Sequence, residues 1–151
     1  MKPEIVLAFE FVEFIPDKLN EHTLYISTTY GTAVHKCFCG CGREVVTPLS
    51  PTAWQMTFDG VSVSLHPSVG SWSLPCQSHY IISKNRVVWA PQWTKEQIAR
   101  GQAHEAQARE RYFETVRDER SDVAARSTPS ADKPKQSFWG RIKRWFLGDS
   151  T

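Results

Sequence analysis

The sequence predicts an α+β chain, in which a small, mainly β domain precedes a long helix and an amphipathic tail. Residues 5–90 contain short runs of β-branched and aromatic residues separated by turn residues, the pattern of a β-rich domain. From Thr94 onward the chain becomes polar and helix-forming. Four cysteines lie in the β-rich part, and they favour a structural zinc ion that would stabilise a small core. The 151 residues suit one such domain with appendages.

Eight β-strands are expected in the β-rich part. They cover residues 5–14, 23–29, 32–37, 43–46, 54–58, 61–65, 78–83 and 86–90. Asp59-Gly60 suits a type I′ turn that would join residues 54–58 to 61–65, with alternate apolar residues of both strands on one face. A second hairpin is expected around Lys84-Asn85, and residues 67–72 are expected to form a loop.

The region after Pro91 is expected to be helical. Thr94 is a good N-cap, and Gln97 completes a capping box for a polar helix that reaches about Val123. The predicted divisions are a domain at 1–92, a helical extension at 93–126, a linker at 127–136 and a tail at 137–151. The tail has aromatic residues on one side and basic residues on the other, which is typical of a helix that docks on a partner or a membrane. The alternative is a tail that packs back on the domain or is disordered.

Charge and hydropathy narrow the classes of function. The net charge of +2 does not favour nucleic acid as a partner. The N-terminal apolar run is interrupted by Glu10 and Glu13, unlike a secretory signal, and no apolar stretch approaches the ~18 residues that span a bilayer. We therefore expect a cytoplasmic location, where clustered cysteines act as ligands or catalysts more often than they form disulfides.

The cysteine spacing predicts one closed zinc site. Cys37, Cys39 and Cys41 lie within five residues, and Cys76 follows later. Tetrahedral zinc needs sulfurs within roughly 4 Å of each other. A flat strand would spread the first three over ~13 Å, so the backbone must fold sharply, as the glycines at positions 40 and 42 permit. Two alternatives are a site in which His35 replaces one cysteine, and redox chemistry at the cysteine pairs 37/39 or 39/41.

A shared zinc ion would also bring serine and histidine residues together. If the segments 35–37 and 76–79 are neighbours, strand alternation places His35 near Ser78. His79 would then point to the opposite face, where Ser68 or Ser71 can reach it. Either pairing would form a dyad in which histidine accepts the serine proton during attack on a carbonyl.

The residues around these serines and histidines are compatible with a catalytic role and with a non-catalytic one. The expected loop at 67–72 contains Gly70 and exposed amides, as an oxyanion hole requires. The G-x-S-x-G elbow of many hydrolases is absent from the sequence. In the non-catalytic interpretation, Ser78 and His79 hydrogen-bond to the zinc thiolates or to neighbouring backbone.

Three motifs together resemble a known family. They are His35-x-Cys-x-Cys-Gly-Cys-Gly, Ser64-Leu-x-Pro-Ser-Val-Gly-x-Trp72 and Cys76-x-Ser-His-Tyr80. In this order and spacing they resemble the BubE-type peptidases of bacterial ubiquitination-like (Bub) operons. The resemblance covers about residues 30–90, so it carries nothing over to the expected helix and tail.

The resemblance implies a serine peptidase of the bacterial cytoplasm that acts in antiphage defence. It would trim the C-terminal tail of a ubiquitin-like protein, remove that protein from targets, or both, with E1-like or E2-like enzymes as further partners. The four cysteines would bind structural zinc. Ser78 would be the nucleophile and His79 or His35 the general base, with Ser68, Gly70 and Ser71 at the substrate. Adjacent residues on a regular strand cannot face each other, so a Ser78–His79 dyad would need a bulge or turn, and the pairs Ser78–His35 and Ser68–His79 stay open.

Two other functions compete with this hypothesis. One is a non-catalytic, zinc-ribbon-like module that binds the ubiquitin-like protein or its conjugating enzymes. The other is a thiol redox protein, which would need an exposed cysteine of low pKa.

Overall fold

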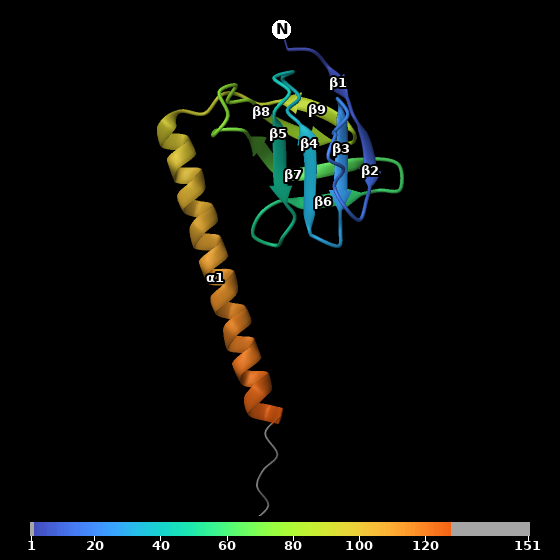
Figure 1. The fold of residues 1–151 in the computed structure, drawn as a ribbon. Helices are drawn as coiled ribbons and strands as arrows, with labels where there is room; N and C mark the ends of the chain where they lie inside the picture. Colours follow the sequence, from blue (N-terminus) through green and yellow to red (C-terminus); the bar gives the residue numbers. More distant parts are fainter. Residues whose placement is uncertain (1, 128–151) are drawn as a thin grey trace, which may run out of the picture. The chain divides into compact units, whose positions relative to one another are not determined.

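The structure is a computed structural model that describes residues 2–127. It confirms a mainly β arrangement followed by one long helix (Figure 1). The predicted tail at 137–151 and nearly all of the linker lie outside the described residues. The strands are β1 Ile5–Val6, β2 Ala8–Phe11, β3 Thr23–Ser27, β4 Thr32–Lys36, β5 Glu44–Pro48, β6 Gln55–Phe58, β7 Val63–Gly70, β8 His79–Ser83 and β9 Arg86–Trp89, and the helix is α1 Lys95–Ser127.

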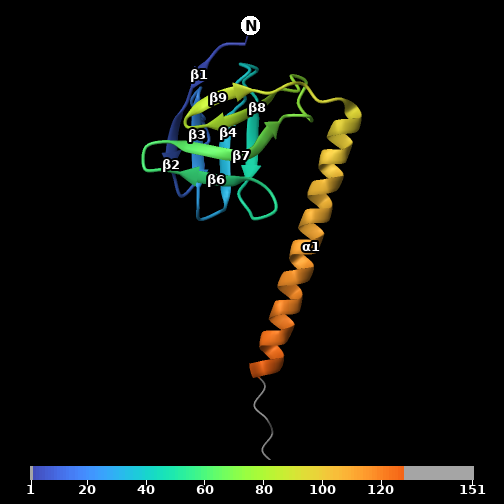
Figure 2. The ribbon, with the colours of Figure 1, turned by 180° about the vertical axis from the view of Figure 1, so that it is seen from behind.

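The strands form two sheets that enclose the core. One sheet has the order β1-β9-β8-β7-β6, and the other has the order β2-β3-β4-β5. Neighbouring strands are antiparallel except β2 and β3, which are parallel. The strands of one sheet cross those of the other in both views (Figure 1, Figure 2), which is the orthogonal form of sheet packing. Both sheets contribute buried apolar side chains to one core, including Leu24, Ile26, Ala33, Val63, Leu65, Val69, Tyr80 and Ile82.

The first predicted strand is divided between the two sheets. Residues 5–6 pair with β9, whereas residues 8–11 pair with β3. Leu7 lies between them with 2 % of its surface exposed, and its N–H donates to the carbonyl of Asn85. The chain therefore changes sheets at a buried leucine, and the prediction of one continuous strand to Phe14 was wrong.

Strand β7 is longer than the sequence predicts. Residues 67–70, expected in a loop, belong to the strand, where Val69 pairs with Tyr80 and Gly70 with His79. The register shifts between Leu65 and Val69. Pro67 argues against a strand, and the alternation of apolar and polar residues is lost at this shift, so the second half of the strand could not be predicted from the sequence.

The two hairpin predictions have different outcomes. Phe58 pairs with Val63, so the loop at Asp59-Gly60 has four residues and the predicted two-residue turn is wrong. The Asp59 carboxylate accepts hydrogen bonds from two amides inside this loop, which stabilises the longer form. The hairpin at Lys84-Asn85 is confirmed, and both residues have the positive φ angles that such a turn requires.

The capping box of α1 is confirmed. The Thr94 hydroxyl accepts from the N–H of Gln97 at 3.3 Å, and the Gln97 side chain accepts from the N–H of Thr94 at 2.8 Å. The helix continues to Ser127, four residues beyond the predicted end. The described chain divides into two compact units after Phe113. Among the described residues, no helix has both the length and the apolar character needed to cross a membrane.

Candidate functional site

The four cysteines come together as the sequence predicts. Their sulfurs all lie within 4.8 Å of one another, and the cysteines are not linked by disulfides. Individual Sγ–Sγ distances are 3.4 Å for Cys37–Cys39, 3.8 Å for Cys37–Cys76 and 3.8 Å for Cys41–Cys76. A tetrahedral ion with bonds of about 2.3 Å separates its sulfurs by about 3.8 Å. The cluster therefore fits one tetrahedral metal ion.

A tight turn after β4 gathers three of these sulfurs. The N–H of Cys37 donates to the carbonyl of Arg43 at 2.7 Å, and the N–H of Gly40 donates to the carbonyl of Cys37 at 3.1 Å. Gly40 and Gly42 have φ angles of 85° and 71°, in the left-handed region that glycine adopts without strain. These glycines provide the sharp fold that three closely spaced cysteines need to reach one ion.

The Ser78 hydroxyl belongs to the cysteine cluster. Its oxygen lies 2.9 Å from the sulfur of Cys37 and 3.2 Å from the sulfur of Cys76, and only 2 % of the residue is exposed. Burial raises the pKa of Cys37 to about 12, against the hydrogen bond from Ser78. Burial also acts to raise the pKa of Cys76, but hydrogen bonds from Ser78 and then from other cysteines outweigh it and lower that pKa to about 6. Ser78 thus favours the thiolate form of Cys76, the form that binds metal.

His35 is a buried core residue on the same side of the fold. Its Nε2 lies 2.8 Å from the hydroxyl of Tyr80, and its ring stacks on Phe38 with 4.6 Å between centroids. Burial lowers the pKa of His35 to about 3, so the imidazole is neutral at ordinary pH. Among the described residues, the group that can share one metal ion contains the four cysteines and not His35. The alternative ligand set with His35 is therefore not supported.

His79 lies on the opposite face and contacts Ser68. Its Nε2 is 2.8 Å from the Ser68 hydroxyl, and its Nδ1 is 2.6 Å from the carbonyl oxygen of Pro91. A carbonyl can only accept a hydrogen bond, so Nδ1 carries the proton and Nε2 is left to accept the serine proton. His79 is 3 % exposed, whereas Ser68 is half-buried. A fixed base thus lies beside an accessible hydroxyl, which is the open pair Ser68–His79 of the sequence analysis.

Two tryptophans cover the imidazole. The rings of Trp72 and Trp93 each lie 5.0 Å from the His79 ring, and they stack on one another at 5.6 Å. A Cβ atom at Gly70 would lie 2.3 Å from the indole nitrogen of Trp72, so only glycine leaves room for this indole. The indoles explain how His79 is buried although it points away from the core.

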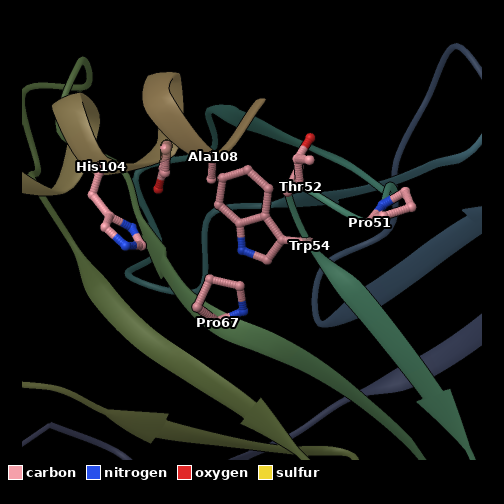
Figure 3. Close-up of a pocket in the computed structure, with 8 residues that line it drawn as sticks. Pro51, Thr52, Trp54, Pro67, His104 and Ala108 are labelled. Carbon is pink, nitrogen blue, oxygen red and sulfur yellow. The ribbon is translucent and has the colours of Figure 1, made fainter. Parts of the chain in front are cut away.

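A cavity of about 470 Å³ adjoins the Ser68–His79 pair. Its wall includes Trp54, Pro67, Ser68, Gly70, Trp72, His79 and Trp93, together with Ile98, Gly101, Gln102, His104 and Glu105 from the start of α1. A second cavity of about 190 Å³ shares four of these residues and is drawn in Figure 3, where Trp54 and Pro67 lie across from His104. Ser68 therefore has space beside it for a substrate.

The remaining predicted residue, Ser71, has a different position. Its N–H donates to the carbonyl of Ser78 at 2.9 Å, so this amide is already used within the sheet. Its side chain is 6 % exposed, and the hydroxyl has no hydrogen-bond partner among the described residues. Of the residues predicted to contact substrate, Ser68 and Gly70 line the cavity, and Ser71 is not part of its wall.

Sequence reasoning missed three parts of this site. The tryptophans at 72 and 93 lie 21 residues apart, and no periodic pattern links them. The third group, the Pro91 carbonyl, cannot be recognised from sequence because every residue has a carbonyl. The one sequence feature that could have indicated these parts is a tryptophan a few residues from a candidate site histidine, as Trp72 is from His79.

An accessible serine hydroxyl beside a buried, oriented histidine is the arrangement of the serine hydrolases. The family model described as "Bacterial ubiquitination-like system serine protease (BubE)" matches residues 11–90, from the end of β2 through β9. This match covers more than half of the chain, and the chain belongs to that family. The predicted resemblance is confirmed, and it identifies the chain as a serine protease of a bacterial ubiquitination-like system. No curated protein and no solved structure matches the chain.

Proposed function

We propose that Ser68 is the nucleophile and His79 the general base of a peptidase that acts on the C-terminal tail of a ubiquitin-like protein. The supporting observation is the 2.8 Å contact between Ser68 Oγ and His79 Nε2, with Nδ1 held by the Pro91 carbonyl. This carbonyl takes the place that a carboxylate has in a catalytic triad, because it fixes the tautomer and the orientation of the imidazole.

The reaction follows from these positions. His79 Nε2 takes the Ser68 proton as Oγ attacks the scissile carbonyl, and the same proton passes to the leaving amine when the peptide bond breaks. Ser68 is then esterified to the N-terminal part of the substrate. Water, activated by His79, hydrolyses this ester and restores the hydroxyl.

This assignment revises the predicted role of Ser78. Ser78 is almost completely buried, and its hydrogen-bond partners among the described side chains are the sulfurs of Cys37 and Cys76. A hydroxyl that binds thiolates lacks a base to remove its proton. We therefore assign Ser78 to the support of the metal ligands, and His35, bound to Tyr80, to the core.

The cysteine cluster would hold zinc as a structural ion. Four protein thiolates fill a tetrahedral coordination sphere, so no position remains at which zinc could activate water. Cys37, Cys39 and Cys41 come from the turn after β4, and Cys76 comes from the connection before β8. The ion would thus join the two sheets next to the strand that begins at His79.

The substrate class comes from the family. A protease of a ubiquitination-like system would process the tail of the ubiquitin-like protein or release it from targets, and E1-like or E2-like enzymes would act in the same pathway. We place this activity in the bacterial cytoplasm, in antiphage defence, as the resemblance implies.

The test is the intact mass of the ubiquitin-like protein of the same system, kept with its full C-terminal tail, after incubation with zinc-loaded enzyme. We expect a discrete C-terminal loss with the wild type and with Ser78→Ala, and no loss with Ser68→Ala. Ser78→Ala is the matched control because it removes the same atom from a neighbouring serine.

Two results would contradict the proposal. Cleavage that survives Ser68→Ala but not Ser78→Ala would return the nucleophile to Ser78. No cleavage by the wild type, together with saturable binding of the ubiquitin-like protein, would favour the non-catalytic binding module.

A further inference from the structure

Half of strand β7 has an open edge. Strand β6 pairs with β7 only as far as Gln55 opposite His66. Before Gln55 the chain leaves this sheet, because Trp54 N–H donates to the carbonyl of Pro48 and Trp54 bridges to Leu49. Within the described residues, Val69 and Gly70 therefore pair with β8 on one side, and residues 67–70 of β7 pair with no strand on the other.

The backbone groups of Gly70 point toward this open edge. In an antiparallel ladder, the N–H and C=O of one residue point to the same side, and successive residues alternate. The N–H of Ser71 donates to the carbonyl of Ser78, the residue just before β8, so Gly70 must direct its groups away from β8. The paired residue agrees with this, since the carbonyl of His79 accepts from Ala90 on the β9 side and not from Gly70.

The open edge borders the cavity beside the nucleophile. Ser68 and Gly70 both line this space, and Trp54 and Trp72 form part of its wall. At about 470 Å³ it falls within the range of pockets that enclose small ligands. Any peptide that enters must find partners for its own backbone N–H and C=O groups, because water is displaced there.

From these observations we propose that the substrate binds in extended form as an added strand on β7, paired with the N–H and C=O of Gly70. The proposal rests on the assignment of Ser68 and His79 as the catalytic pair. In edge pairing of this kind, hydrogen bonds to the substrate main chain give affinity, and pockets for the substrate side chains give specificity. Two residues of strand span about 6.6 Å. The substrate residue paired with Gly70 should thus lie about two residues from the scissile bond.

The first test observes Gly70 directly. The chain has eight glycines, so ¹⁵N-glycine labelling of full-length Ser68→Ala protein gives a simple amide spectrum in which Gly70 can be assigned. The probe is a synthetic peptide with the C-terminal tail of the ubiquitin-like protein, added to the zinc-loaded protein. We expect the Gly70 amide to shift and its hydrogen exchange to slow by about threefold or more, as a new hydrogen bond requires. Gly60, in the β6–β7 loop, is the control and should not change.

The second test removes, one at a time, the substrate N–H groups that would pair with β7. Amides in the tail are replaced by esters one at a time, outside the scissile bond, and cleavage by wild-type enzyme is measured. Loss of a paired N–H should lower kcat/KM by about three- to tenfold, and the loss should occur at the position about two residues from the scissile bond and not at its neighbours.

The outcomes separate this inference from the proposed function. An unchanged Gly70 amide, with ester effects equal at all positions, would overturn edge pairing even if cleavage requires Ser68. Cleavage by the Ser68→Ala protein, or none by the wild type, would overturn the catalytic assignment, and the Gly70 amide would still decide whether the tail binds this edge.

Discussion

Ser68 lies on β7 and Ser78 lies just before the neighbouring strand β8, and their hydroxyls contact side chains of different kinds. Ser78 is buried on the core side and touches the sulfurs of Cys37 and Cys76. Ser68 is half-buried on the other face, where it touches an imidazole and lines a cavity. The difference between them is one of partner and access, since the side chains are identical. Access to substrate and an oriented base make Ser68 the stronger candidate for reaction.

The two histidines repeat this contrast. His35 is completely buried, stacks on Phe38 and bonds to the hydroxyl of Tyr80. His79 is nearly as buried, yet one nitrogen reaches a serine at a cavity wall and the other is fixed by a backbone carbonyl. Burial alone therefore does not distinguish the structural histidine from the candidate base.

The largest effect should come from removal of the metal. Metal binding contributes on the order of 10 kcal/mol in small zinc domains, and here the ion would join both sheets. We expect one zinc per chain, and a large fall in the thermal midpoint on chelation, measured by circular dichroism. Alkylation of the zinc-loaded protein should label none of the cysteines until chelator is added. Rapid labelling of one or two cysteines in the native protein would favour the redox alternative.

The next largest effect should separate the histidines. His79→Gln removes the proposed base and should lower kcat by about 10²–10⁴-fold. His35→Gln should leave kcat within a few-fold of wild type, because His35 has no contact with the reacting groups. It should instead lower the free energy of unfolding by about 1–3 kcal/mol through the lost buried hydrogen bond to Tyr80. Steady-state kinetics and urea unfolding on both variants provide the comparison.

A loss of kcat with His35→Gln at unchanged stability would contradict this division of roles. It would restore His35 as the candidate base, in the pair with Ser78 that the sequence left open.

The cysteine cluster could be predicted from sequence, whereas the candidate Ser–His pair could be predicted only as one of two open pairs. Cysteine is recognisable from the sequence as a possible metal ligand, and the glycines at 40 and 42 predict the turn that brings the cysteines together. Strand alternation correctly places Ser78 with the cysteines and turns His79 to the opposite face. It could not choose between Ser68 and Ser71 for His79, because that depends on the register shift in β7.

Tertiary structure supplies what the local pattern lacks. The hydrogen bond between His35 and Tyr80 joins residues 45 positions apart in the sequence. Pairing with β8 extends β7 to Gly70, whereas the sequence pattern ends this strand at residue 65. Neither fact is encoded in a short window. The same long-range pairing creates the open edge at Gly70.

The smallest predicted effect compares the two serines by stability. Ser78→Ala should lower the free energy of unfolding by about 1–3 kcal/mol, because buried thiolates lose a hydrogen bond. Ser68→Ala should change it by about 0.5 kcal/mol or less, as for a partly exposed site. The pKa of Cys76, about 6 with Ser78 in place, should rise toward its ordinary value in Ser78→Ala. Protons compete with metal for the thiolate, so on acidification this variant should lose zinc at a higher pH than the wild type does.

Urea unfolding and a zinc-release titration against pH measure both quantities, with Ser68→Ala as the matched control. If zinc release is the same in all three proteins, the Ser78 hydroxyl does not support the cysteine cluster, and its burial beside the sulfurs has no consequence for metal binding. If Ser78→Ala shifts zinc release and keeps turnover, the two serines differ as their surroundings indicate: one hydroxyl holds a thiolate, and the other is free to attack a substrate.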